Sequence, residues 1–135
     1  MPIQPYLFME GRAEEAIDFW RKAIGAEVQM LMRWKDCPEK DNMPVKQPDD
    51  KVMHASLRVG DATILVSDGG CGGQANFQGF GLTLGARDEA EAQRLFTALS
   101  DGGKVQMPLG KTFFSPAFGM VHDKFGIMWM VIVEH

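Results

Sequence analysis

Two stretches of the chain repeat apolar residues at the spacing of a helix. Over about residues 12–24 and 89–100, apolar side chains recur every three or four positions, which predicts two amphipathic helices. Asp88 and Glu91 form a capping box before the second helix, and Gly25 and Gly102 are placed to end the helices in a left-handed conformation. The side chains predicted to be buried are Ala13, Ala16, Ile17, Trp20 and Ile24, then Ala92, Leu95, Phe96 and Leu99.

Shorter apolar runs of strand length lie around the helices. One run precedes each helix and three follow it, so the order strand, helix, strand, strand, strand occurs twice. Segments 59–62 and 123–126 contain glycine and predict tight hairpins between the last two strands of each set. The predicted strands are 3–9, 27–34, 53–59 and 63–67 in the first half, and 80–86, 104–107, 117–122 and 127–134 in the second.

An internal repeat supports this order. A shift of 77 residues superposes eight identical residues within 24 positions, and the run Val28-Gln29-Met30 falls on Val105-Gln106-Met107. We therefore predict one α+β domain over 1–135, made of two βαβββ modules. The modules cover about 1–68 and 80–135, a glycine-rich connector covers about 69–79, and residues 36–50 form a long exposed loop.

Composition narrows the class of protein. The chain has 135 residues, of which 45% are hydrophobic and 24% charged, as in one ordinary globular domain. A formal charge of -4 with scattered basic residues predicts that nucleic acid is not a partner. Because no signal peptide or membrane-spanning run is recognisable, we expect a cytoplasmic protein without a membrane partner. Cys37 and Cys71 are far apart and predict neither a disulfide framework nor a zinc motif.

Four short motifs follow the repeated order along the chain. They are Pro5-Tyr6-Leu7-Phe8, Gly11-x-Ala13-Glu14-Glu15-Ala16-x-x-Phe19-Trp20, Met53-His54-Ala55 and Asp123-Lys124-Phe125-Gly126-Ile127-x-Trp129-Met130. Together they resemble the vicinal-oxygen-chelate superfamily (glyoxalase, bleomycin resistance and dioxygenase), and its PhnB-like branch in particular. The resemblance implies a curved mixed sheet that forms an incomplete barrel, with helices outside and a ligand cavity inside. It also implies a homodimer, with or without exchanged modules.

The resemblance also implies where a metal would bind, because metal-using members take one ligand from the first and one from the last strand of each module. By position these residues are Pro5 and Ile64 in the first module, and Leu82 and Met130 in the second. None of these side chains is a ligand for a divalent metal. We therefore expect no metal and no cofactor.

Some PhnB-like proteins carry the label of a 3-demethylubiquinone methyltransferase. That activity needs a site for S-adenosylmethionine, which is usually cradled by a glycine-rich turn between a strand and a helix. Here the glycine-rich run at 69–73 is followed by a strand and not by a helix, so its geometry does not suit a phosphate or a nucleoside. The sequence therefore argues against methyl transfer.

The segment 53–59 alternates between polar and apolar residues, so a strand there has one face of each kind. The polar residues are His54, Ser56 and Arg58. If helices cover the apolar face, His54 could act as a general acid or base, and Arg58 could pair with a carboxylate or phosphonate. The alternative is that His54 bonds within the sheet and Arg58 lies in solvent.

Further candidates lie in the second half. The last strand is apolar on both faces, as expected of a central strand, and Trp129, Met130 and Phe118 are predicted to contact a ligand. The ten methionines of the chain would give such a site an adaptable wall, although core packing explains them equally well.

Acidic residues at strand ends form a weaker pattern. His122 is followed by Asp123, as in an acid-oriented imidazole, but its position favours an ordinary surface turn. Glu10, Asp68 and Glu134 end other strands, and we expect them to be solvated. The alternative is that they approach one another, which would raise a pKa or trap a cation.

Two functional hypotheses follow. The first is a protein that binds or sequesters a small organic molecule in a metal-free cavity, as drug-resistance members of the superfamily do. The second is a metal-independent enzyme that uses His54 and Arg58 on a small acidic or phosphonate-like substrate. A binder predicts affinity without product, whereas an enzyme predicts turnover that is lost in His54→Ala.

Overall fold

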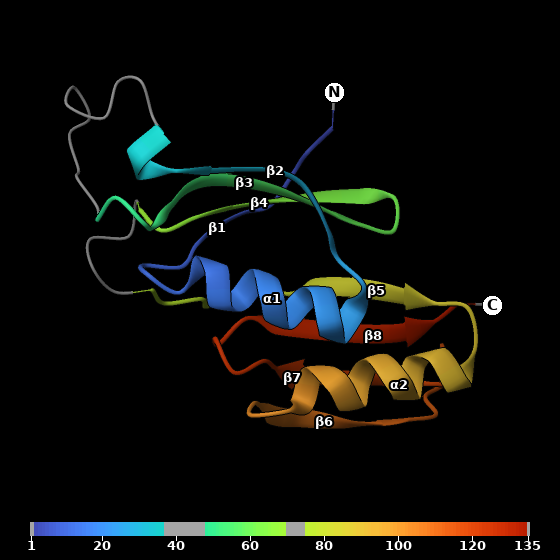
Figure 1. The fold of residues 1–135 in the computed structure, drawn as a ribbon. Coiled ribbons are helices and arrows are strands. Elements are labelled where there is room, and N and C mark those ends of the chain that lie inside the picture. Colours follow the sequence, from blue (N-terminus) through green and yellow to red (C-terminus); the bar gives the residue numbers. More distant parts are fainter. Residues whose placement is uncertain (1, 37–47, 70–74, 135) are drawn as a thin grey trace. The chain divides into compact units, whose positions relative to one another are not determined.

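The computed structural model describes residues 2–36, 48–69 and 75–134 (Figure 1). The chain divides into two compact units, Met1–Ala75 and Asn76–His135, and this boundary falls inside the predicted connector. Both cysteines, most of the predicted loop and the glycine-rich run beyond Gly69 lie outside the described residues.

The first unit is a four-stranded mixed sheet with one helix. The strand order is β1-β4-β3-β2, in which β1 is parallel to β4 and the other pairs are antiparallel (Figure 1). Its elements are β1 (Tyr6–Phe8), α1 (Ala13–Ile24), β2 (Glu27–Arg33), the 3₁₀ turn η1 (Trp34–Asp36), β3 (Val52–Val59) and β4 (Ala62–Ser67).

The second unit repeats this topology. Its strand order is β5-β8-β7-β6, again with one parallel pair, β5 with β8. Its elements are β5 (Leu82–Ala86), α2 (Glu89–Ser100), β6 (Lys104–Gly110), β7 (Phe118–His122) and β8 (Met128–Val133). The α+β class, the βαβββ order in each half and the central place of the last strand are therefore confirmed.

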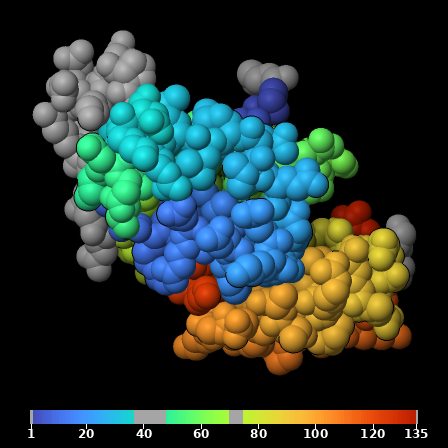
Figure 2. Space-filling view, in the orientation of Figure 1, coloured from blue at the N-terminus to red at the C-terminus, as the bar shows by residue number. Residues whose placement is uncertain are grey.

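The helices begin and end close to the predicted residues. α1 is closed by Gly25, whose φ is 72°, and α2 begins at the predicted cap, where the Asp88 carboxylate accepts from the N–H of Glu91 at 2.8 Å. One burial prediction was wrong: Ala23 is buried and Ile24 is only half-buried. Each helix shows an outer face to solvent (Figure 2). In the described part of the chain, no helix is long and apolar enough to cross a membrane.

Both predicted hairpin turns are present, but the second connection is longer than the first. Val59 pairs with Ala62, which leaves a two-residue turn as predicted. The last ladder pair of the second hairpin is His122 with Met128, and within this five-residue connection the N–H of Gly126 donates to the carbonyl of Asp123 at 2.9 Å, so the tight turn predicted at 123–126 is confirmed. The longer loop turns backbone N–H groups inward, and these need an acceptor.

Asp123 supplies that acceptor. Its Oδ1 accepts from the N–H of Phe125 at 2.9 Å and of Ile127 at 3.1 Å, and its Oδ2 accepts from Trp129 Nε1 at 2.8 Å. The residue is 3% exposed, so the prediction of a surface turn was wrong for Asp123. Burial of a carboxylate is tolerated here because both oxygens are hydrogen-bonded.

Each sheet buries the face on which its helix packs. In the first unit this face carries Leu7, Ala55, Leu57 and Val66, which are all buried. In the second unit α2 comes so close that a Cβ on residue 119, a glycine, would lie 2.7 Å from Phe96 Cε2. The period of two along the strands places the intervening residues on the opposite face.

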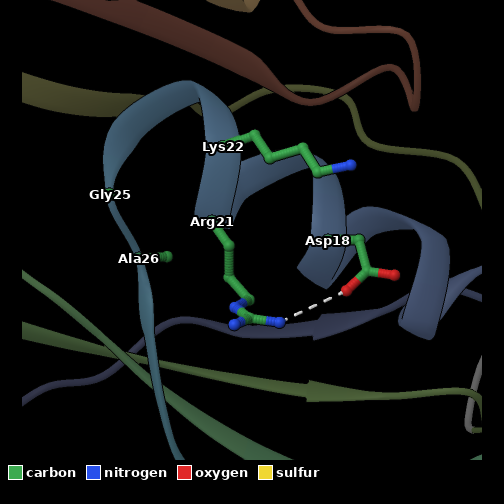
Figure 3. A pocket seen from close by; sticks show the side chains of 5 residues that line it. All are labelled: Asp18, Arg21, Lys22, Gly25 and Ala26. Carbon is green, nitrogen blue, oxygen red and sulfur yellow. Dashed lines mark ion pairs between the residues drawn. The ribbon is translucent and has the colours of Figure 1, made fainter.

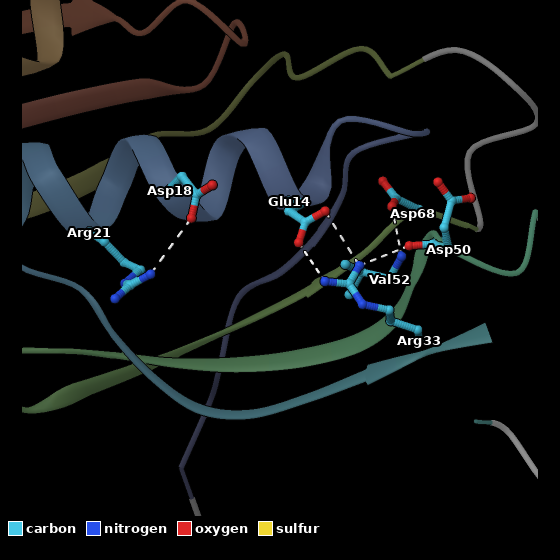
Figure 4. A network of polar contacts seen from close by, with 7 residues as sticks. All are labelled: Glu14, Asp18, Arg21, Arg33, Asp50, Val52 and Asp68. Carbon is cyan, nitrogen blue, oxygen red and sulfur yellow. Dashed lines mark hydrogen bonds and ion pairs between the residues drawn. The ribbon is translucent and has the colours of Figure 1, made fainter. Parts of the chain in front are cut away.

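Asp68 joins the helix of the first unit to its sheet. The residue is 1% exposed, and its Oδ1 accepts from the N–H of Gly11 at 2.7 Å and of Ala13 at 2.8 Å. Its Oδ2 accepts from the N–H of Val52 at 3.0 Å (Figure 4). Because the local N-cap, Arg12, makes no side-chain capping bond, Asp68 caps α1 from another strand. The prediction that Asp68 is solvated was therefore wrong.

An ion pair lies beside this contact. Arg33 donates to both carboxylate oxygens of Glu14 and, at 2.8 Å, to the carbonyl oxygen of Asp50 (Figure 4). The hydrogen bond from Arg33 lowers the pKa of Glu14. Since Glu14 is largely exposed, this pair contributes much less to stability than the buried Asp68.

We predict that Asp68→Ala lowers the free energy of unfolding of the first unit by about 3 kcal/mol or more, because it leaves three backbone N–H groups without an acceptor. Urea denaturation followed by circular dichroism measures the loss. The control is Asp18→Ala, which removes an exposed ion pair with Arg21 and should cost less than about 0.5 kcal/mol. Equal losses in the two variants would contradict the capping role.

Candidate functional site

The face of the first sheet turned away from α1 gathers aromatic and polar side chains. Residues that pair across neighbouring strands lie on the same face, so Tyr6, Leu65, Ser56 and Met30 form one row across all four strands. Phe8 and Ser67 pair beside this row, as do His54 and Met32. We call this surface, made of Tyr6, Phe8, Met30, Met32, His54, Ser56, Leu65 and Ser67, the open face.

Three rings lie together at one end of the open face. The hydroxyl of Tyr6 is 2.8 Å from Nδ1 of His54, and the two rings are tilted with centroids 5.6 Å apart. Phe8 stacks on the other side of the Tyr6 ring, with centroids 4.7 Å apart and an angle of 12°. The prediction that the polar residues of β3 lie opposite the helix is consistent with this geometry.

Burial raises the pKa of Tyr6 above its ordinary value of 10.0, and a hydrogen bond with Ser67 partly offsets the rise. Ser67 is itself tied to the backbone: its hydroxyl donates to the carbonyl of Met53 at 2.8 Å and accepts from the N–H of Gly69 at 3.2 Å. Tyr6 is 38% exposed, so its ring remains accessible in spite of these contacts.

Arg58 is not part of this cluster. It lies four residues from His54 along β3, and the rise of a strand puts their Cα atoms about 13 Å apart. Its side chain is exposed, and its Nε donates to the carbonyl of Gly60 at 3.2 Å. The Arg58 guanidinium is therefore hydrogen-bonded at the turn after β3 and not to His54. Ser56 lies between them on the open face.

In the first module, the two positions that the resemblance assigns to metal ligands lie one residue away from residues of the open face. Ile64 pairs with Leu57 on the buried face, so its neighbour Leu65 is the residue of β4 that lies on the open face. In β1 it is Tyr6, and not Pro5, that lies there. In the described residues no group of three or more His, Cys, Asp and Glu side chains could hold a metal ion. The absence of a metal remains a prediction from the sequence.

The second unit has a comparable face rich in methionine. Met107, Met120, Met130 and Thr83 form a row across its four strands, and Phe118 pairs with Ile132 in the adjacent row. The methyl groups of Met128 and Met130 converge on Gly81. Met130 and Phe118, which were predicted to contact a ligand, both lie on this face.

Trp129 does not lie there. It is 1% exposed on the buried side of β8, and its indole N–H donates to Asp123. Trp129 therefore lies on the opposite face of the sheet from Met130 and Phe118, and its contact with a ligand stays a prediction. The apolar sequence of β8 concealed the alternation, because both faces of this central strand carry apolar side chains.

The described surface of each unit has a hollow. One of about 350 Å³ lies at the end of α1 and is bordered by Asp18, Arg21, Lys22, Gly25 and Ala26 (Figure 3). Asp18 and Arg21 form an ion pair at 3.7 Å. The other, of about 450 Å³, lies between the start of α2 and the segment around Leu109. Neither contains a predicted site residue, and the charged, solvated border of the first resembles an ordinary helix surface.

Comparison with known proteins identifies the family. Residues 2–132 match the family model of 3-demethylubiquinone-9 3-methyltransferase. The chain belongs to this family. It is 34% identical to protein YjdN of Escherichia coli, and the alignment covers 98% of this chain and 95% of YjdN. These relations support the resemblance to PhnB-like proteins that was drawn from the motifs.

Solved structures agree with this family and with its fold. Protein PA1353 of Pseudomonas aeruginosa is 38% identical, with a TM-score of 0.86 and coverage of 99% of this chain and 98% of that chain. A PhnB protein of Bacillus cereus is 27% identical, with a TM-score of 0.79 and coverage of 98% and 99%. The fold alone is shared with fosfomycin resistance protein FosX of Mesorhizobium loti, at 12% identity, a TM-score of 0.63 and coverage of 98% and 90%.

Sequence reasoning missed half of the open face, namely Tyr6, Phe8, Leu65 and Ser67. Tyr6 and Phe8 were noted as a family motif and not as site residues, although their alternation with the buried Leu7 already indicated a shared face. Ser67 was assigned only to a strand. The contact between Tyr6 and His54 joins residues 48 positions apart, and no local pattern predicts it.

We predict that the single tyrosine of the chain titrates above pH 10.0 in the folded protein, because burial disfavours the phenolate. Absorbance at 295 nm measures this, and in urea the midpoint should fall to about 10. The contribution of Tyr6 to stability is present below pH 10.0 and is lost as the pH rises through the folded pKa. Tyr6→Phe should abolish the signal, and a midpoint at or below 10.0 in the native state would contradict the burial of Tyr6.

Proposed function

We propose that the protein binds a small organic molecule on the open face of the first unit. The observation that carries this proposal is the ring cluster of Tyr6, Phe8 and His54. Aromatic side chains with a polar tip are typical of surfaces that hold a ligand in a fixed orientation. A half-exposed stack of this kind offers apolar area to a ligand while keeping one hydrogen-bonding edge available.

The surroundings of the cluster favour a planar, mainly apolar ligand. Met30 and Met32 flank it on β2, and the flexible thioether side chain adapts its shape to rings of different outline. Leu65 adds an aliphatic surface in the same row. No cationic side chain belongs to the cluster, which makes a strongly anionic ligand the weaker candidate.

His54 supplies the polar recognition in this proposal. One of its ring nitrogens, Nδ1, is already paired with Tyr6. The other, Nε2, is then the atom that meets the ligand, as a donor if Tyr6 donates to Nδ1 and as an acceptor if Nδ1 donates to Tyr6.

The fold is compatible with binding and also with catalysis. A resistance protein for fosfomycin shares it, and so does a glyoxalase-related enzyme of Fulvimarina pelagi at 15% identity, with a TM-score of 0.67 and coverage of 99% and 88%. A shared fold does not carry a function from one protein to another. We therefore base the proposal on the side chains of this chain.

A second candidate is a metal-independent enzyme in which His54 moves a proton. The hydrogen bond between Tyr6 and His54 favours it, since a paired phenol and imidazole can relay a proton between ligand and solvent. Arg58 does not support this candidate, because its guanidinium is held at the far end of β3. Incubation with each ligand, followed by mass spectrometry of the recovered compound, distinguishes turnover from sequestration.

We predict that a planar aromatic probe binds with an affinity that depends on the ring cluster. Acetophenone, benzoate, phenylphosphonate and S-adenosylmethionine form the test panel, and titration calorimetry measures binding. Phe8→Leu should weaken the binding of aromatic probes roughly 2- to 10-fold, since one stacking partner is lost. His54→Gln should weaken the binding of the probes that carry an oxygen acceptor.

The matched control is Phe113→Leu, which changes a fully exposed phenylalanine of the second unit and should leave affinity unchanged. Thermal unfolding of each variant shows whether the fold is kept. Binding of the probes that is unchanged in Phe8→Leu and His54→Gln would contradict the proposed site. Tight binding of S-adenosylmethionine would instead support the methyltransferase named by the family.

A further inference from the structure

Four side chains that are soft metal ligands share one face of the second sheet. On the face turned away from α2, Met120 of β7 pairs with Met130 of β8, and His122 of β7 pairs with Met128 of β8. We call these four residues, Met120, His122, Met128 and Met130, the methionine block. Residues two apart on a strand lie about 7 Å from each other, and the Cβ atoms of a cross-strand pair lie about 5 Å apart. Three thioethers and one imidazole therefore occupy the corners of a small rectangle.

The ends of two of these side chains already lie beside the same residue. A Cβ built on Gly81 would be 3.1 Å from the methyl carbon of Met130 and 3.3 Å from that of Met128. The methionine side chain has three rotatable bonds, so its sulfur can turn toward a shared point above the sheet. All four residues of the block are half-buried, which leaves part of each side chain in contact with solvent.

The fold itself does not require these ligands. The two units have the same topology, and the equivalent pairs of the first unit are Ser56 with Leu65 and Arg58 with Thr63. None of these four residues carries a thioether or an imidazole. The methionine block is therefore a property of the second unit and not of the βαβββ arrangement.

The charges near the block favour a monovalent ion. Asp123 follows His122, but its carboxylate is buried and accepts from the loop and from Trp129 on the other side of the sheet. Lys104 pairs with His122 from β6 and is exposed, so the nearby charge is positive. Neutral ligands beside an ammonium group compensate little of a double positive charge. Thioether sulfur selects Cu(I), whereas carboxylate and carbonyl oxygens suit magnesium and calcium.

We propose that the methionine block binds one Cu(I) ion, with the sulfur atoms of Met120, Met128 and Met130 and the imidazole of His122 as its ligands. The expectation that no metal binds was drawn for divalent ions at the positions of the superfamily, and thioether ligands select a different kind of ion. The site uses no residue of the open face of the first unit and does not depend on the organic ligand proposed there.

The first test uses Ag(I), which has the charge and the filled d shell of Cu(I) and is not oxidised by air. Because thiolates bind both ions, the full-length Cys37→Ser/Cys71→Ser protein is used. With ¹³C in every methionine methyl group, Ag(I) should move the signals of the block and leave that of Met30 in place. Anaerobic competition with the chromophoric chelator bicinchoninate should then show one bound Cu(I) per chain.

Substitutions identify the ligands. Met120→Leu keeps the volume of the side chain and removes the sulfur, so the affinity for Ag(I) should fall roughly 10-fold or more, and His122→Gln should have a similar effect. The matched control is Met30→Leu, which changes a methionine of the first unit that is 42% exposed and should leave the affinity unchanged. Met128→Leu removes another ligand and should repeat the loss, so it replaces Met120→Leu if that variant melts at a lower temperature.

Two results would overturn the inference. One is that neither Ag(I) nor Cu(I) moves the methyl signals of the methionine block. The other is an affinity that is the same in Met120→Leu, Met128→Leu and Met30→Leu, because the ion would then be bound by other groups. Neither result affects the proposed function, which is tested with organic probes on the first unit.

Discussion

The first unit depends on the placement of one carboxylate in its interior. Asp68 directly follows β4 and accepts hydrogen bonds from the beginning of α1 and the beginning of β3, so three separate segments are held at one point. These hydrogen bonds fix the position of the first turn of α1 relative to the start of β3 and the end of β4. The alternation along β4 follows from them: once Asp68 points to the helix, Ser67 points to the open face. The second unit uses Asp123 in a similar way, to hold a loop and the indole of Trp129.

The proposed site is a consequence of that arrangement. The helix takes up one face of the sheet, so the residues between the buried positions collect on the other. Because β1 is parallel to β4 and β4 is antiparallel to β3, Tyr6 is brought to His54 across a chain distance that no turn connects. The end of β4 therefore contributes both to stability, through Asp68, and to the proposed site, through Ser67.

Much of the fold could be predicted from the sequence because its signals are local. The helices, the order of the strands and the cap at Asp88 all depend on residues a few positions apart. Long-range contacts could not be predicted in this way. Asp68 was read as solvated because its carboxylate accepts from backbone N–H groups 16 to 57 positions away. Asp123 was read as part of a surface turn although its partners are only two to six positions away. The side of β8 on which Trp129 lies could not be predicted because both faces of that strand are apolar, while the homodimer remains a prediction from the family resemblance.

The location of the ligand is the central claim, and methionine methyl groups report on it directly. With ¹³C in the methyl group of every methionine, a titration with acetophenone is followed in the methyl spectrum. The account predicts that the signals of Met30 and Met32 shift, since both lie on the open face. Met9 is buried beneath the helix and should not move. Shifts confined to Met9, or to the methionines of the second unit, would contradict it.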